Sequence, residues 1–144
     1  MVRTVNDSLT LANRLRPVLL RLARELRREI HSLGVTGGQV SLLASIKHQP
    51  GITASELAEL ERVSAPGMSG HLVRLEAANL IERTRATDRR RVGLFLTAEG
   101  EKVLKSVRNR RNSFLAERLE RLEAGERDRV EDSIDALQKL LDLE

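Results

Sequence analysis

The chain has 144 residues, 40% of them hydrophobic and 32% charged, and its formal net charge is +4. This length suits a single domain, and this balance of residues excludes global disorder. The absence of cysteine excludes disulfides, thiolate metal sites and thiol redox sensing, and no apolar run approaches the roughly 18 residues that span a membrane.

A long apolar stripe marks the first expected helix, over about residues 8–33. Leucine and isoleucine recur along it at spacings of three and four residues. Asp7 or Ser8 can cap its start, Pro17 should kink it or mark its real start, and Gly34 should end it. Because the stripe is long and narrow, it is typical of a helix–helix seam rather than of a broad core face.

Two shorter helices are expected next, each opened by a residue pattern that caps free backbone amides. Thr36 with a glutamine three residues later predicts a helix over about 37–48. Thr53 with a glutamate three residues later is a second capping box. It opens a short helix whose Leu57 and Leu60 should point inward.

A third capped helix follows after a brief turn. Ser64 is its cap, and Pro66 falls in the first turn, where its missing N–H is tolerated. The helix should run to about Ala78, and Asn79 can adopt the left-handed conformation that stops it. Residues 53–79 therefore follow the helix-turn-helix plan, in which the second helix can lie in a DNA major groove.

The face of this third helix can be assigned at 100° per residue. Met68, Leu72 and Leu75 share one side and should pack inward. The remaining surface is small and polar, so a DNA backbone could approach it closely. An ordinary helical hairpin with caps would show the same pattern, which leaves that alternative open. The candidate DNA contacts on this helix are Ser64, Ala65, Pro66, Gly67, Ser69, Gly70 and Arg74.

Two short strands are expected at Leu80–Thr84 and Val92–Thr97, joined by an arginine-rich turn. Residues 83–91 hold five arginines and one aspartate, so the rest of the chain carries equal numbers of basic and acidic side chains. A charge excess this local favours contact with a polyanion over a solvated turn. In a two-stranded wing, Arg89, Arg90 and Arg91 could reach an adjacent minor groove, and Asp88 could hold Arg90 in place.

The last expected helices span about residues 98–143, with Gly125 separating them. The final one repeats apolar residues at strict spacings of three and four, from Val130 to Leu141. The run Arg108 to Arg111 has two readings. It is a second DNA patch, or it is a solvated helix face balanced by nearby glutamates, and the second reading is favoured.

The remaining composition narrows the possible partners. The only aromatic residues are Phe95 and Phe114, which cannot form a stacking platform for bases, so a nucleic-acid partner should be duplex. Three widely spaced histidines favour no metal, and nothing indicates a cofactor. The scattered carboxylates form no catalytic arrangement, so an enzyme is not expected. Without a signal-peptide pattern, we expect a cytoplasmic protein with no membrane contact.

From Asn13 onward, the chain resembles the MarR family of bacterial winged helix-turn-helix regulators. The ordered set of matching segments carries the resemblance, since each segment alone is weak. The segments are Thr53-Ala54-Ser55-Glu56-Leu57-Ala58, Val63-Ser64-Ala65-Pro66, Arg74 to Arg83, Asp88-Arg89-Arg90 and Leu94-Phe95-Leu96-Thr97-Ala98-Glu99-Gly100.

The resemblance implies a mainly α fold with a small two-stranded β-wing, within one domain over residues 1–144. A winged helix-turn-helix at about 36–97 would be flanked by dimerisation helices at about 8–33 and 98–143. The family's pattern further implies a palindromic duplex operator, recognition by the helix from Ser64, and wing contacts through Asp88 and Arg90.

Four positions depart from that pattern. Gly67 stands where the family often has a hydroxyl residue and Gly70 where it has an arginine, so the wing and the shape of the DNA should carry more of the recognition. Arg62 stands in the turn where glycine is common, which suggests a further phosphate contact. His71 stands where the family tends to be apolar, and it is interpreted as lying at the edge of the core rather than contacting DNA or ligand.

We therefore expect a homodimeric DNA-binding regulator of the repressor type. Many members of the resembled family bind a small anionic or aromatic effector between the dimerisation helices and the DNA-binding lobe, although no residue here identifies such a ligand. Two alternatives remain. One is an architectural duplex binder with little sequence preference, and the other is a winged helix that assembles with an acidic protein.

Overall fold

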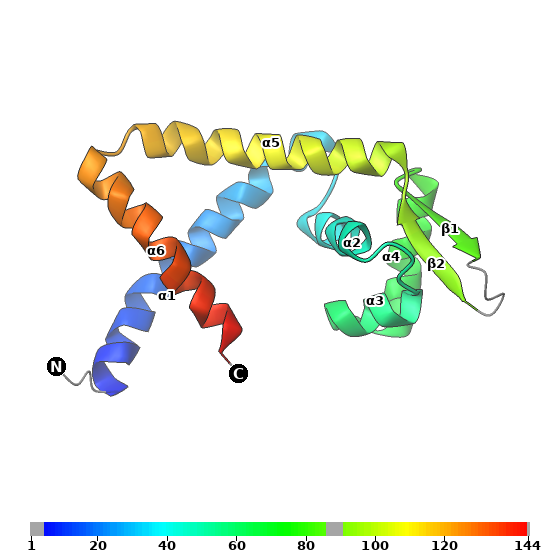
Figure 1. Ribbon diagram of the computed structural model, residues 1–144, viewed down its shortest axis with the longest axis horizontal. Coiled ribbons are helices and arrows are strands. Elements are labelled where there is room, and N and C mark those ends of the chain that lie inside the picture. The colour runs from blue at the N-terminus through cyan, green and yellow to red at the C-terminus, as the bar shows by residue number, and fades with distance from the viewer. Residues whose placement is uncertain (1–4, 86–90, 144) are drawn as a thin grey trace.

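The computed structural model describes residues 5–85 and 91–143. Figure 1 shows a long helix with a lobe at one end, formed by residues 37–85 and 91–96. The lobe hangs beneath the beginning of that helix, α5, and the first and last helices lie toward the opposite side of the molecule. The elements in chain order are α1 (Val5–Glu29), a 3-10 turn (His31–Leu33), α2 (Gly37–His48), α3 (Ala54–Glu61), α4 (Ala65–Ala77), β1 (Ile81–Arg85), β2 (Val92–Leu96), α5 (Ala98–Glu120) and α6 (Ala124–Asp142).

Most helices of the lobe begin where a side chain caps them. Thr36 and Gln39 form a complete capping box at α2, and the Ser64 hydroxyl accepts the Gly67 N–H at 3.2 Å. At α3 the box is only half formed, which corrects the expectation. The Thr53 hydroxyl accepts the Glu56 N–H at 3.1 Å, but the Glu56 carboxylate turns away from the Thr53 backbone.

One apolar cluster forms the core of the lobe. Met68, Leu72 and Leu75 of α4 are at most 1% exposed, as expected, and Leu57 of α3 is fully buried. Leu60 is 53% exposed, so the expectation that it points inward is wrong. The buried face of α3 is centred between Leu57 and Ala58, and at 100° per residue Leu60 lies about 110° from that centre.

The first helix differs from the expectation at both ends. It starts at Val5, continues through Pro17 and ends at Glu29, where the 3-10 turn takes over. Pro17 therefore does not mark the start of the helix. Gly34 closes the turn rather than the helix itself, with a φ of 74° that favours glycine.

The two strands pair antiparallel from Ile81 opposite Leu96 to Arg85 opposite Val92. The Gly51–Ile52 segment lies against β2, where the Gly51 N–H donates to the Leu94 carbonyl at 2.8 Å. A Cβ on Gly93 would lie 3.0 Å from the Gly51 backbone. Gly93 is thus required by this close approach.

The two carboxyl-terminal helices meet at a turn before Gly125. Glu123 caps α6 through a capping box with Glu126, so Gly125 lies in the first turn of α6 and does not separate the helices. Neither α1 nor α6 contains a buried residue. No helix in the described part of the chain is both long and apolar enough to cross a membrane.

Candidate nucleic-acid interface

The outer face of α4 carries the seven candidate contacts predicted on this helix. Ser64, Ala65, Pro66, Ser69 and Arg74 are exposed, and Gly67 and Gly70 are partly exposed. Val73, which lies on the same face, is 59% exposed. The three large apolar side chains of α4 point the other way into the core, so this face is free of packing within the chain.

Arg74 is held by a neighbour on its own helix. Its Nη2 lies 3.1 Å from Nδ1 of His71. Because a guanidinium only donates, Nδ1 must accept and the imidazole proton lies on Nε2. His71 is partly buried, and through this bond it orients Arg74. Whether His71 itself contacts DNA or a ligand stays a prediction.

The two glycines of α4 differ in what surrounds them. A Cβ on Gly67 would lie 3.0 Å from Ser64 Oγ and 3.2 Å from Val63 Cγ1, because the capping hydroxyl occupies that space. A Cβ on Gly70 would meet nothing within 4 Å. A side chain is therefore hindered at Gly67 and sterically open at Gly70.

Arg62 lies in the turn between α3 and α4 with a φ of 55°. This left-handed conformation explains why glycine is common at such a position. The side chain is exposed, and it adds a cation beside the start of α4.

The wing tip, with Asp88, Arg89 and Arg90, lies outside the described residues. The structure describes the side chains of two other arginines of the charged segment, and each pairs with a carboxylate of the helix-turn-helix. Arg91 Nη2 lies 2.6 Å from Glu56 Oε1 of α3, and Arg83 forms an ion pair with Glu76 of α4. Sequence reasoning missed both pairs because each joins residues from different elements.

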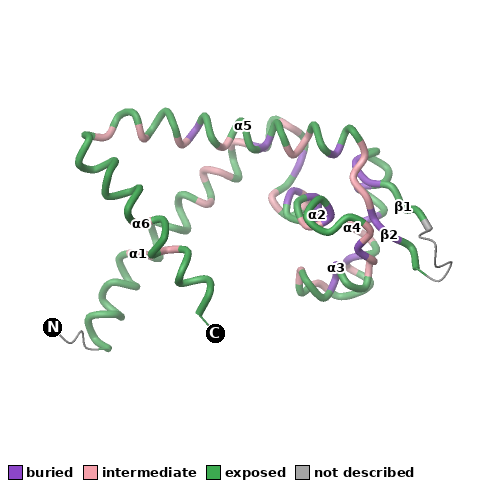
Figure 2. Tube along the Cα trace, viewed as in Figure 1, coloured by how far each residue is buried: buried purple, intermediate pink, exposed green. Residues whose placement is uncertain are grey.

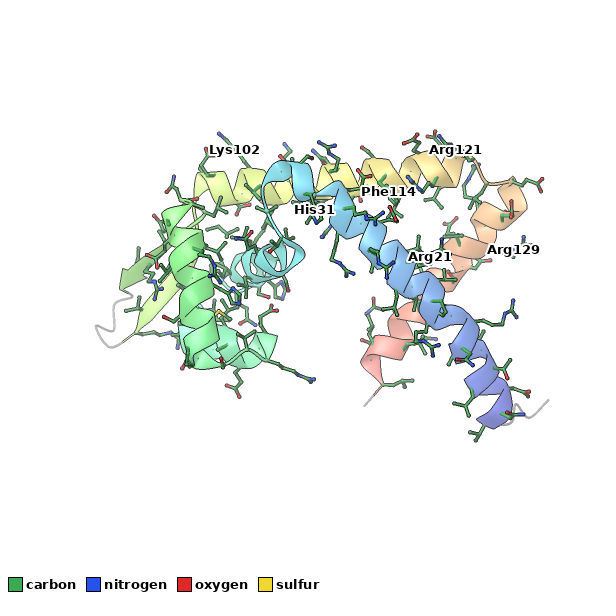
Figure 3. The ribbon with its side chains drawn as sticks, turned by 180° about the vertical axis from the view of Figure 1, so that it is seen from behind. Arg21, His31, Lys102, Phe114, Arg121 and Arg129 are labelled. Atoms are coloured by element: carbon green, nitrogen blue, oxygen red, sulfur yellow. The ribbon has the colours of Figure 1, made fainter. Side chains whose placement is uncertain are left out.

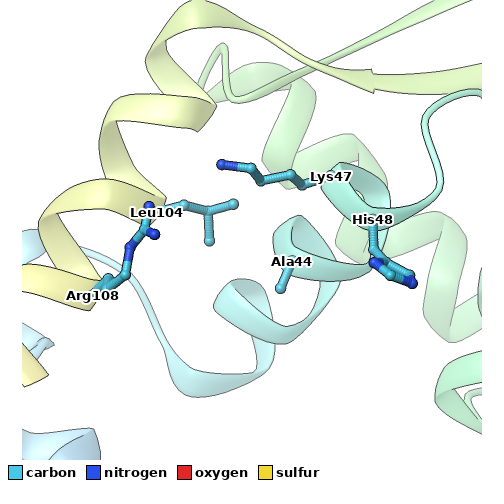
Figure 4. Close-up of a pocket in the computed structure, with 5 residues that line it drawn as sticks. All are labelled: Ala44, Lys47, His48, Leu104 and Arg108. Atoms are coloured by element: carbon cyan, nitrogen blue, oxygen red, sulfur yellow. The ribbon is translucent and has the colours of Figure 1, made fainter.

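The run at the middle of α5 is largely a solvated face, as favoured, since Arg108, Asn109 and Arg110 are exposed and Arg111 is partly buried. Two of the nearby glutamates pair with other cations, Glu101 with Lys47 at 2.9 Å and Glu117 with Arg121 at 3.0 Å. Arg108 lines a shallow cavity of about 460 Å³. The other residues that line this cavity are Ala44, Lys47, His48 and Leu104 (Figure 4).

A second cavity of about 490 Å³ lies between α1, α2 and α5. Arg27 and Arg111 line it together with Gly37 and Gly38 of the first turn of α2. The Nε of Arg111 is buried and has no hydrogen-bond partner among the described residues. Two cations at a helix amino terminus make this cavity suited to an anion.

The helices away from the lobe leave a large apolar surface uncovered. On α1, Leu9 is 64% exposed and Leu20 is 57% exposed, and on α6 Ile134 is 59% exposed. Phe114 of α5 is buried where α1 meets α5 (Figure 3). The Arg118 Cζ lies 3.5 Å from the centroid of the Phe114 ring. Apolar surface on this scale is typical of a protein interface.

Known proteins resemble the chain in sequence and in fold. The MarR family model matches residues 35–92. The Bacillus subtilis HTH-type transcriptional repressor MdtR is 37% identical over 111 residues, which are 72% of this chain and 72% of MdtR.

Two solved structures illustrate the likeness in fold. A Pseudomonas aeruginosa protein assigned as a transcriptional regulator superposes with a TM-score of 0.86 at 29% identity, covering 98% of this chain and all of that one. An S. aureus MepR variant bound to an oligodeoxyribonucleotide superposes with a TM-score of 0.71 at 21% identity, covering 91% and 97% of the two chains.

Proposed function

Because this chain belongs to the MarR family of DNA-binding transcriptional regulators, and is not an enzyme, we propose that it is a cytoplasmic repressor that binds duplex DNA as a homodimer. The outer face of α4 carries this proposal, since it is unpacked and lies next to the arginine-rich wing. The proposed contacts are Ser64, Ala65, Pro66, Gly67, Ser69, Gly70 and Arg74 on α4, with Asp88, Arg89, Arg90 and Arg91 on the wing. The oligonucleotide-bound MepR variant and the repressor name of MdtR support this assignment by analogy.

The exposed apolar faces of α1 and α6 support the dimer. A second copy would cover these faces and would present two α4 helices related by a two-fold axis. Such a dimer reads a pseudo-palindrome whose half-sites lie about one helical turn apart, roughly 34–36 Å.

The basic cavity beside the first turn of α2 supports release by a small anionic effector. It lies between a proposed dimerisation helix, α1, and the lobe. An anion there would bind Arg27 and Arg111. If the two arginines can hold it in only one arrangement of α1 and the lobe, binding would shift the equilibrium toward that arrangement. An operator-binding assay tests this. Adding small carboxylates or phosphates should raise the Kd for the operator.

A salt series on duplex binding tests the proposed function. Bound fragments selected from the source genome would supply the operator, and random duplex of the same length is the reference. We expect steep salt dependence and an operator bound at least ~1000-fold more tightly than random duplex. Equal affinity for the two would indicate the architectural alternative, and no duplex binding would indicate the assembly module.

The wing has its own test in Arg90→Ala. If Arg90 contacts a phosphate, the variant should bind the operator more weakly, and the salt slope should fall by about one unit. A slope equal to that of the wild type would remove Arg90 from the interface.

A further inference from the structure

An ion pair joins the base of the wing to the first helix of the helix-turn-helix. Arg91 immediately precedes β2, and its Nη2 lies 2.6 Å from Oε1 of Glu56. The Thr53 hydroxyl donates to the same oxygen at 3.0 Å, so the carboxylate has a fixed orientation toward Arg91. The Glu56 carboxylate binds Arg91 and the Thr53 hydroxyl, and it does not accept from the Thr53 backbone N–H as a complete capping box would require.

This pair neutralises one of the positive charges of the wing. Arg83, the other described arginine of the segment with a known partner, is likewise held by Glu76. Both strands of the wing are therefore tied to the lobe by carboxylates, β2 to α3 and β1 to α4.

The Glu56–Arg91 pair is accessible enough to be exchanged. The two side chains are 45% and 50% exposed, and pairs in such positions contribute little to folding stability. A DNA phosphate offers Arg91 a comparable or stronger partner, with release of a counterion in addition. Glu56 and a phosphate would then compete for one guanidinium.

We propose that Glu56 sets the affinity for duplex DNA by holding Arg91 against α3 and away from the phosphate backbone. The inference rests on the proposed duplex binding and deepens it, since Glu56 itself touches no DNA. Removing its charge should free Arg91 to bind a phosphate.

The experiment compares Glu56→Gln with Glu59→Gln in the full-length protein. The cap of α3 stays in place, because the Thr53 hydroxyl accepts from the backbone N–H of residue 56, and glutamine keeps a side-chain oxygen that can accept from the same hydroxyl. Glu59 lies one turn along the same helix, is exposed, and forms no side-chain hydrogen bond or ion pair within the described residues, so it controls for the loss of one negative charge. Glu56→Gln should bind random duplex about two- to fivefold more tightly at low salt. Its salt slope should steepen by about 0.9.

Arg91→Ala and the double variant complete the test. If Glu56 acts through Arg91, then Glu56→Gln has no effect in the Arg91→Ala background. Equal effects of Glu56→Gln and Glu59→Gln, a persistent effect without Arg91, or weaker binding by Glu56→Gln would each overturn the inference while leaving duplex binding intact. A wild-type protein that binds no duplex would overturn the proposed function and this inference together.

Discussion

The lobe and the outer helices of this chain have opposite relations to water. Figure 2 shows buried residues gathered in the lobe and along parts of α5, whereas α1 and α6 are almost entirely exposed. The apolar stripe that begins in α1 makes the change visible, because Ile30, just beyond the end of α1 and beside the lobe, is fully buried, while Leu19 and Leu22 of α1 are more than 40% exposed.

This difference separates two sources of stability. The lobe buries its leucines and isoleucines within one chain, so its folding should not depend on protein concentration. The outer helices carry exposed apolar side chains such as Leu9, Leu20 and Ile134, so their stability should depend on a second copy and hence on concentration. The predictions below test that separation in order of expected size.

Truncation after Leu122 should have the largest effect, because it removes α6 and leaves the exposed face of α1 without a partner. We expect a monomer or an aggregate in analytical ultracentrifugation, with loss of the dimer. The lobe should still unfold cooperatively in any monomeric fraction. A truncated protein that remains a well-behaved dimer would show that α6 is dispensable for assembly.

Gly100→Ala should have the next largest effect, within the contact between α5 and the lobe. A Cβ at this position would lie 2.2 Å from the Leu80 carbonyl oxygen, and two backbones would have to move apart. We expect a loss of at least about 1–3 kcal/mol in urea unfolding at fixed protein concentration. Gly125→Ala in α6 is the matched control, since its Cβ would meet nothing within 4 Å. A similar loss in the control would contradict the steric explanation.

Gly70→Ala should have the smallest effect and the opposite sign. The position is in the middle of α4 and sterically open, so alanine should stabilise the lobe by about 0.5–1 kcal/mol. The gain should be the same at low and high protein concentration, because Gly70 lies outside the proposed dimer interface. A destabilised variant would mean that Gly70 has a packing role that the open space does not reveal.

Local features of the fold were predictable from the sequence. The cap residues Thr36 and Ser64 each accept from an amide three residues away, so their patterns can be read along the chain. The buried side of α4 followed from the helical period alone. The MarR resemblance supplied the winged architecture, which the comparisons with known proteins confirm.

Contacts between elements were beyond such reasoning. Leu60 was misassigned because the packing of α2 and α4 against α3, not leucine spacing, decides which side of that short helix is buried. The Glu61 carboxylate accepts hydrogen bonds from Ser41 and Ser45 of α2, and Glu56 pairs with Arg91, and neither contact has a pattern within one segment. The DNA contacts proposed for α4 and the wing remain predictions.

The hydrogen bonds that join the start of α5 to the lobe limit how α5 and the lobe can move relative to each other. The Thr97 N–H donates to the Leu80 carbonyl at 3.1 Å, and its hydroxyl donates to the Asn79 carbonyl at 2.6 Å, so no compliant side chain separates the two backbones. A helix of 23 residues is about 34 Å long. Tilting such a rigid beam by about 5° displaces its far end by roughly 3 Å. In the proposed dimer, a small change at the outer helices would therefore shift α4 of each copy by almost the rise of one base pair.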